Sequence, residues 1–92
     1  MTKKEKRNQF FLSIWAKRRH FSEIDGTFLG TECLTVYFHH ILEKNKYKQA
    51  EFDEDNIILL TWQQHDQVGL DMHYYEEINK RREKLKIKYE LN

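Results

Sequence analysis

Apolar residues at helical spacing mark the first regular element of the chain. The large apolar residues of this stretch recur three and four positions apart, which places them on one face of a helix. They are Phe10, Phe11, Ile14 and Trp15. We predict a helix over about residues 8–19 that packs this aromatic face inward. The residues before it are polar and basic, and we expect residues 1–7 to fray.

Two stretches between residues 20 and 60 have the composition of β-strands. Residues 33–41 are rich in β-branched and aromatic types, and residues 57–60 form a short apolar run typical of a buried strand. Residues 20–32 contain the turn signal Asp25-Gly26 and are expected to form a loop or a small hairpin. Residues 43–55, between the two strands, are mainly polar, and a connection of this length often carries a function.

The chain after residue 60 returns to helical patterns. A short helix is predicted from Trp62 to near Gly69. Asp71 suits the N-cap of a last helix over about residues 71–89, which combines a rough apolar stripe with many basic residues. The predicted fold is therefore α+β, and a chain of 92 residues forms a single domain, residues 1–92.

Charge is distributed unevenly along the chain, although the net charge is only +1. Residues 3–20 hold seven basic residues against one acid, residues 21–78 three lysines against twelve acids, and residues 79–89 six basic residues against one acid. An acidic centre suits a cation, and basic ends suit a polyanion. Ordinary solvated helix faces give the same pattern, so charge alone favours a nucleic-acid partner only slightly.

Cysteine content and hydropathy limit the possible disulfides, zinc sites and cellular location. The single cysteine, Cys33, excludes an internal disulfide and a zinc site made of four cysteines. No apolar run reaches membrane-spanning length, and the basic N-terminus is not followed by a signal-peptide core. We therefore expect a soluble, cytoplasmic protein with no membrane partner.

A group of histidines and one asparagine carries the candidate chemistry. Neutral imidazole is the commonest nitrogen ligand of divalent transition metals. His39 and His65 can therefore share an ion if the helix that carries His65 packs across the two strands. Neighbouring side chains of a strand point to opposite faces, so His40 needs another task, such as general base, unless the strand ends or bulges there. Asn56 can tie the long loop to the opposite strand, or offer its carbonyl oxygen to the metal. Each residue alone is also an ordinary core or turn residue, and only the joint spacing indicates a site.

The joint spacing resembles that of the HNH endonucleases, which are ββα-metal nucleases often found in bacteriophages. The resemblance covers about residues 20–70 and depends on three parts of the sequence. They are YFHHILEKNKY at residues 37–47, FDEDNIILL at residues 52–60, and His65. It implies a ββα-metal (HNH) core, to which this chain adds the N-terminal helix and the basic C-terminal helix.

The resemblance also implies a role for each motif residue. His39 and His65 bind one divalent metal ion, for which we consider Mg²⁺, Mn²⁺, Ni²⁺ and Zn²⁺, and His40 is the general base that activates water. Asn56 orients that base or, in some branches of the family, binds the metal. The implied reaction is the hydrolysis of DNA phosphodiester bonds. The implied enzyme acts as a monomer or homodimer in the cytoplasm, including that of a phage-infected host.

The sequence departs from the family pattern at the structural zinc site. Many relatives hold a zinc ion with two Cys-x-x-Cys knuckles, and the corresponding stretches here, residues 22–26 and 61–65, contain no cysteine. We predict no structural zinc and expect Ile24, Trp62 and the N-terminal aromatic residues to fill its space.

A second departure concerns the catalytic metal. A further histidine ligand of some relatives corresponds to Gly69 here. The ion would then keep two histidines and waters, or would recruit Asn56, Asp66 or His73.

DNA affinity in so small an enzyme comes largely from lysine and arginine on phosphates. The predicted contacts are Lys44 and Lys46 near the site and Arg18, Arg19, Arg81 and Arg82 further out. The missing knuckles and ligand leave one alternative, a catalytically weakened HNH-fold module that binds DNA or protein. Another alternative is a small structural protein in which the histidines are core residues.

Overall fold

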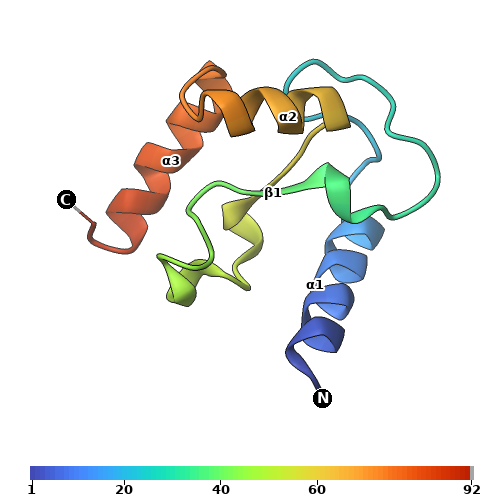
Figure 1. Cartoon of the computed structure of the whole chain (residues 1–92), viewed down its shortest axis with the longest axis horizontal. Helices are drawn as coiled ribbons and strands as arrows, with labels where there is room; N and C mark the ends of the chain where they lie inside the picture. Colours follow the sequence, from blue (N-terminus) through green and yellow to red (C-terminus); the bar gives the residue numbers. More distant parts are fainter. Residues whose placement is uncertain (92) are drawn as a thin grey trace.

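In the part of the chain that the structure describes, residues 1–91, three α-helices surround one small antiparallel sheet (Figure 1). The protein is described from a computed structural model. Its helices are α1 (Lys3–Lys17), α2 (Trp62–Leu70) and α3 (Glu76–Lys88), and its strands are β1 (Phe38–His40) and β2 (Ile57–Leu59). Short 3₁₀ turns lie at Thr35–Tyr37, Lys48–Ala50 and Glu54–Asn56. The predicted α+β class is confirmed.

The register of the two strands decides where the histidines point. Phe38 pairs with Leu59, His39 with Ile58, and His40 with Ile57. Because successive side chains of a strand alternate between its faces, His40 shares a face with Phe38, and His39 lies on the other. The strand predicted over residues 33–41 is too long, since β2 is its only partner among the described residues. Residues 35–37 form a 3₁₀ turn instead.

Apolar side chains pack on both faces of this sheet. The cluster on the α1 side consists of Phe11, Ile14, Trp15, Leu29, Phe38, Ile57 and Leu59. The cluster on the side of α2 and α3 consists of Ile41, Leu42, Ala50, Ile58, Leu60, Val68, Ile78 and Leu85. Burial of each large aliphatic side chain contributes about 1.5–3 kcal/mol to folding. His40 is thereby turned toward α1 and His39 toward α2.

Helix α1 begins well before the predicted residue 8, so the expectation that residues 1–7 fray is wrong. The Thr2 hydroxyl accepts a hydrogen bond from the backbone N–H of Glu5 at 3.1 Å, and the Glu5 carboxylate accepts one from the N–H of Thr2 at 3.3 Å. This capping box satisfies two N–H groups that a helix start otherwise leaves open. It also brings Arg7 into a regular helix.

The boundary between α2 and α3 differs from the prediction as well. Helix α2 ends at Leu70, close to the predicted Gly69. Asp71 does not cap the last helix, because its carboxylate accepts the backbone N–H of His73 at 3.0 Å and so closes a turn after α2. Helix α3 therefore begins only at Glu76.

The loops follow the sequence pattern more closely. Residues 20–32 form a small hairpin with a bridge between Phe21 and Phe28, in which Gly26 takes the positive φ of 78° that favours glycine. Residues 43–55 form the long connection between the strands, with a 3₁₀ turn at Lys48–Ala50.

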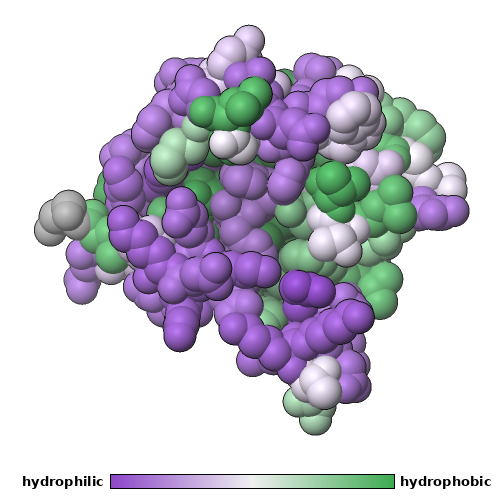
Figure 2. Space-filling view, viewed as in Figure 1, coloured by the Kyte–Doolittle hydropathy of each residue, from purple (hydrophilic) through white to green (hydrophobic). Residues whose placement is uncertain are grey.

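The outer surface is mainly polar. Figure 2 shows apolar side chains on the side of the loop between α1 and β1, where Phe28, Leu34 and Val36 are exposed, and hydrophilic ones over most of the remaining face. Within residues 1–91, no helix has the length and apolar character needed to cross a membrane.

Candidate functional site

His39 and His65 meet where α2 packs across the sheet. His39 lies in β1 and His65 in α2, and their ring centroids are 5.5 Å apart with an interplanar angle of 87°. A metal ion about 2.1 Å from one nitrogen of each ring, in tetrahedral geometry, places two imidazole centroids roughly 5 Å apart. The observed separation is compatible with two ligands of one ion, and the metal-binding role of the pair stays a prediction.

The surroundings of His39 favour the protonation state that a ligand needs. Burial lowers its pKa most, and the neighbouring charges of His65, His40 and Arg82 lower it further, to about 4. The imidazole is therefore neutral at pH 7 and keeps a free lone pair. A neutral ring is the form that binds a divalent metal.

His40 is held by the long loop rather than by the metal pair. Its Nε2 donates a hydrogen bond to the backbone carbonyl of Glu51 at 2.9 Å. Because a carbonyl oxygen only accepts, the proton of the neutral ring is on Nε2, and Nδ1 carries the lone pair. Burial lowers the pKa of His40, as do Lys44 and Arg7, while the bond to Glu51 acts in the opposite direction. Such a ring can accept a proton through Nδ1.

Asn56 ties the long loop to the end of β1. Its side-chain oxygen accepts the N–H of Leu42 at 2.7 Å, and its Nδ2 donates to the carbonyls of Leu42 at 3.0 Å and Ala50 at 3.1 Å. The residue is 0% exposed, and its side-chain groups are satisfied by these bonds. Asn56 therefore ties the long loop to the end of β1, as predicted, and its buried side chain is not part of the groove lining.

One groove of about 450 Å³ brings these histidines together. Its lining includes His39 and His40 from opposite faces of β1, so it runs along the strand edge that β2 leaves uncovered. His65 closes one side. Arg7 and Lys44 add positive charge to the same groove.

Arg7 is the groove residue that the sequence reasoning missed. Because residues 1–7 were expected to fray, Arg7 was given no role, although the capping-box pattern of Thr2 and Glu5 is visible in the sequence. With the helix in place, Arg7 lies near enough to His40 to lower its pKa.

Ligands of the ion beyond the two histidines stay a prediction. Within residues 1–91, no group of three or more His, Cys, Asp or Glu side chains is placed to hold a metal ion. Asp66 is exposed on α2 and does not line the groove, and His73 accepts a hydrogen bond from Arg82 at 3.3 Å.

Arg82, for which a contact with DNA was predicted, is bonded inside the protein. Its side chain is buried, with the residue 4% exposed. The guanidinium donates to the carbonyl of Met72 and to the side-chain oxygen of Asn79, both at 2.8 Å. Its charge lowers the pKa of His39 from inside the protein.

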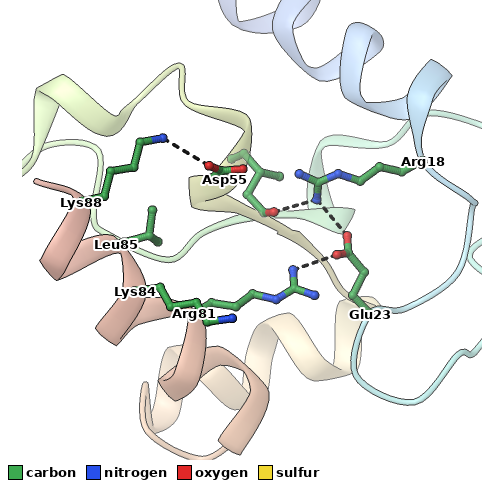
Figure 3. Close-up of a pocket in the computed structure, with 8 residues that line it drawn as sticks. Arg18, Glu23, Asp55, Arg81, Lys84, Leu85 and Lys88 are labelled. Atoms are coloured by element: carbon green, nitrogen blue, oxygen red, sulfur yellow. Dashed lines mark hydrogen bonds and ion pairs between the residues drawn. The ribbon is translucent and has the colours of Figure 1, made fainter.

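Arg18 and Arg81 both form ion pairs with another residue of the protein. Figure 3 shows both guanidinium groups converging on Glu23, at 2.9 Å and 2.8 Å. Arg18 also donates to the carbonyls of Ile57 and Glu54, each at 2.7 Å. These bonds join the end of α1 and helix α3 to the second strand. Neither arginine lines the histidine groove, and their contact with DNA stays a prediction.

The remaining predicted DNA contacts differ in position. Lys44 lines the groove, as predicted for a residue near the site. Lys46 and Arg19 are exposed and lie over the rings of Tyr47 and Phe21, at 5.4 Å and 5.9 Å from the ring centroids. Both lie outside the groove lining, and their contact with DNA stays a prediction.

A hydrogen bond joins the two stretches that the resemblance compares with zinc knuckles. The Ser22 hydroxyl donates to Oε1 of Gln64 at 2.6 Å, and both residues are buried. The Ser22 oxygen also accepts the N–H of Ile24 at 3.1 Å. Ile24 packs against the core as expected, whereas Trp62 is 55% exposed and does not fill this space.

Comparisons with protein-family models, curated proteins and solved structures gave no match. The interpretation of the site therefore depends on the side chains of this chain and on the resemblance of its motif.

Proposed function

We propose that this chain is a divalent-metal-dependent DNA endonuclease of the HNH type, which hydrolyses phosphodiester bonds. One observation carries the proposal: His40, with its tautomer fixed by Glu51, borders the same groove as the His39–His65 pair. The groove also holds the cations Arg7 and Lys44. A base, two metal ligands and phosphate-binding cations in one groove are the groups that this reaction needs.

In the proposed reaction His40 acts on water. Its Nδ1 takes a proton from the water molecule as the water oxygen bonds to phosphorus, and the bond from phosphorus to the 3′ oxygen breaks. The leaving oxygen then takes a proton from solvent. The Glu51 carbonyl stabilises the imidazolium that forms, because it accepts the hydrogen bond from Nε2 at 2.9 Å.

His39 and His65 would hold the metal ion, which when bound supplies a positive charge that stabilises the phosphate and the leaving oxygen. Two protein ligands leave the remaining coordination positions to water and phosphate oxygens. Asn56 acts as a positioning residue, since it holds the loop that carries Glu51.

Nicking of supercoiled plasmid tests the proposal. The full chain is incubated with plasmid and Mg²⁺, Mn²⁺, Ni²⁺ or Zn²⁺ in turn, and His40→Ala is compared with the unaltered protein. We expect nicking with at least one ion and a rate roughly 100-fold or more lower for His40→Ala, because a positioned base contributes that much. The matched control is His20→Gln, whose amide can keep the hydrogen bond that Nε2 of His20 forms with the carbonyl of Trp15 at 3.0 Å.

Two outcomes would overturn the assignment. Equal nicking by His40→Ala would identify a contaminating nuclease or another mechanism. DNA binding without nicking in any of the four ions would instead favour the non-catalytic DNA-binding module.

A further inference from the structure

The histidine groove continues into a second hollow along α1. This hollow has a volume of about 360 Å³ and is lined by residues of α1 and of the long loop. Its lining residues are Lys3, Lys4, Arg7, Lys44, Asn45 and Glu51. Arg7, Lys44 and Asn45 also line the histidine groove, so the two hollows form one continuous surface.

Positive charge dominates this surface. Four cations line the two hollows against the two carboxylates of Glu43 and Glu51. Glu51 pairs with Lys3 at 3.5 Å. Among residues 1–91, no carboxylate forms an ion pair with Lys4, Arg7 or Lys44. These three charges are therefore available to an anion from outside.

Within the described residues, Arg7 lacks a hydrogen-bond partner for one of its atoms as well as an ion-pair partner. Its Nε is buried, yet it has no hydrogen-bond partner in the described part of the chain. A buried donor without an acceptor costs free energy, and such groups are rare in folded proteins. The guanidinium fork matches the oxygens of a phosphate, and a turn of the side chain toward the groove on binding would give Nε an acceptor.

We propose that Lys3, Lys4, Arg7 and Lys44 bind the backbone of the DNA strand that is cut, with Arg7 on the phosphate beside His40. A row of cations over two adjoining hollows suits a chain of phosphates better than one small anion, which would need only one of them. The inference rests on the proposed endonuclease function for its substrate. It assigns the first two turns of α1 to substrate binding.

The salt dependence of DNA binding tests this surface without any metal. Binding of the full chain to a fluorescent DNA duplex is measured by anisotropy in EDTA over a range of salt concentrations. Each lost phosphate contact lowers the slope of log K against log salt by about 0.9 for duplex DNA. We expect the slope to fall by about 1 for Arg7→Gln and by roughly 2 to 3 for the triple variant Lys3→Gln/Lys4→Gln/Arg7→Gln.

Two further variants control for charge and folding. Lys80→Gln removes one positive charge from the exposed side of α3, outside both hollows, and leaves the slope unchanged. Arg7→Lys keeps the charge and hence most of the slope, but loses the fork and lowers the nicking rate. Circular dichroism confirms that each variant keeps its helices.

The outcomes separate this inference from the proposed function. Unchanged slopes in Arg7→Gln and in the triple variant would overturn the proposal that this surface binds the DNA backbone, even if the protein nicks plasmid. A lowered slope in the variants of a protein that never nicks plasmid would support DNA binding by this surface and overturn the proposed endonuclease function.

Discussion

The Nε2 of His40 lies 2.9 Å from the carbonyl oxygen of Glu51, a residue of the loop that leaves the same strand. This bond fixes the tautomer of the ring and leaves Nδ1 as the basic nitrogen. The loop is itself held by Asn56, which bonds Leu42 and Ala50. The orientation of the proposed base therefore depends on an asparagine whose side-chain hydrogen bonds go to Leu42 and Ala50 rather than to the base.

Replacement of Asn56 should lower the stability of the fold and the activity together. Asn56→Ala leaves the N–H and the carbonyl of Leu42 without their partners in a fully buried site, and it removes one of the two hydrogen bonds to the carbonyl of Ala50. Each unpaired buried group costs about 1–3 kcal/mol, so we expect a loss of roughly 3 kcal/mol or more in the free energy of unfolding. Urea denaturation measures this loss.

The matched control for this variant is Asn45→Ala, in an exposed part of the same loop. We expect it to change the free energy of unfolding by less than about 0.5 kcal/mol. A similar loss in both variants would mean that the three bonds of Asn56 do not hold the loop.

Removal of the two ligands should abolish metal binding. Calorimetric titration with Zn²⁺ or Ni²⁺ is expected to give one site per chain. Loss of His39 or His65 should weaken it by more than about 100-fold, since even indirect partners of metal ligands change the affinity 10–100-fold. Bound metal should also raise the free energy of unfolding, by about 2.7 kcal/mol at a free ion concentration of 100 times Kd. Undiminished binding by the double variant His39→Ala/His65→Ala would place the ion elsewhere.

Local sequence signals predicted the centre of this fold well. The apolar run at residues 57–60, the helix from Trp62 and the long connection before them all lie where expected. Each depends on burial or on turn chemistry that is visible in a few neighbouring residues. The meeting of His39 and His65 follows, because the helix after β2 must pack back on the sheet.

Contacts between distant segments were harder to predict. Arg82 belongs to a basic stretch that looks solvent-exposed, yet tertiary packing buries it against the carbonyl of Met72. Arg18 and Arg81 look like phosphate contacts in the sequence, but in the structure both form ion pairs with Glu23. Charge alone does not distinguish an arginine that binds DNA from one that joins two helices, because the partner is set by the fold.

The bond between Ser22 and Gln64 should contribute measurably to the fold. It joins the turn after α1 to helix α2 at 2.6 Å, in the place where the resemblance would put a zinc ion. Ser22→Ala leaves the N–H of Ile24 without a partner and removes one of the two hydrogen bonds to Oε1 of Gln64, which keeps the N–H of Thr61 at 2.9 Å. We therefore expect a loss of about 1–3 kcal/mol in the free energy of unfolding. A double-mutant cycle with Gln64→Leu should give a coupling of about 1 kcal/mol. A coupling near zero would show that the two segments are held by apolar packing alone.

The metal-free protein should lose stability in mild acid because of His39. Its pKa is about 4 in the folded protein against the ordinary 6.5, since it is buried among positive charges. The unfolded chain therefore binds more protons between these values. The stabilising contribution is fully present above pH 6.5 and is lost as the pH falls toward 4.

Urea denaturation in EDTA across this pH range checks the prediction. His39→Phe keeps an apolar ring in place without a titrating group, so its free energy of unfolding should depend less on pH than that of the unaltered protein. Some dependence of the same sign remains, because burial also lowers the pKa of His40. His20→Gln, which replaces a histidine outside the groove and can keep its hydrogen bond to the carbonyl of Trp15, serves as the control. If His39→Phe and the control keep the same slope, His39 is not held in its neutral form by the fold.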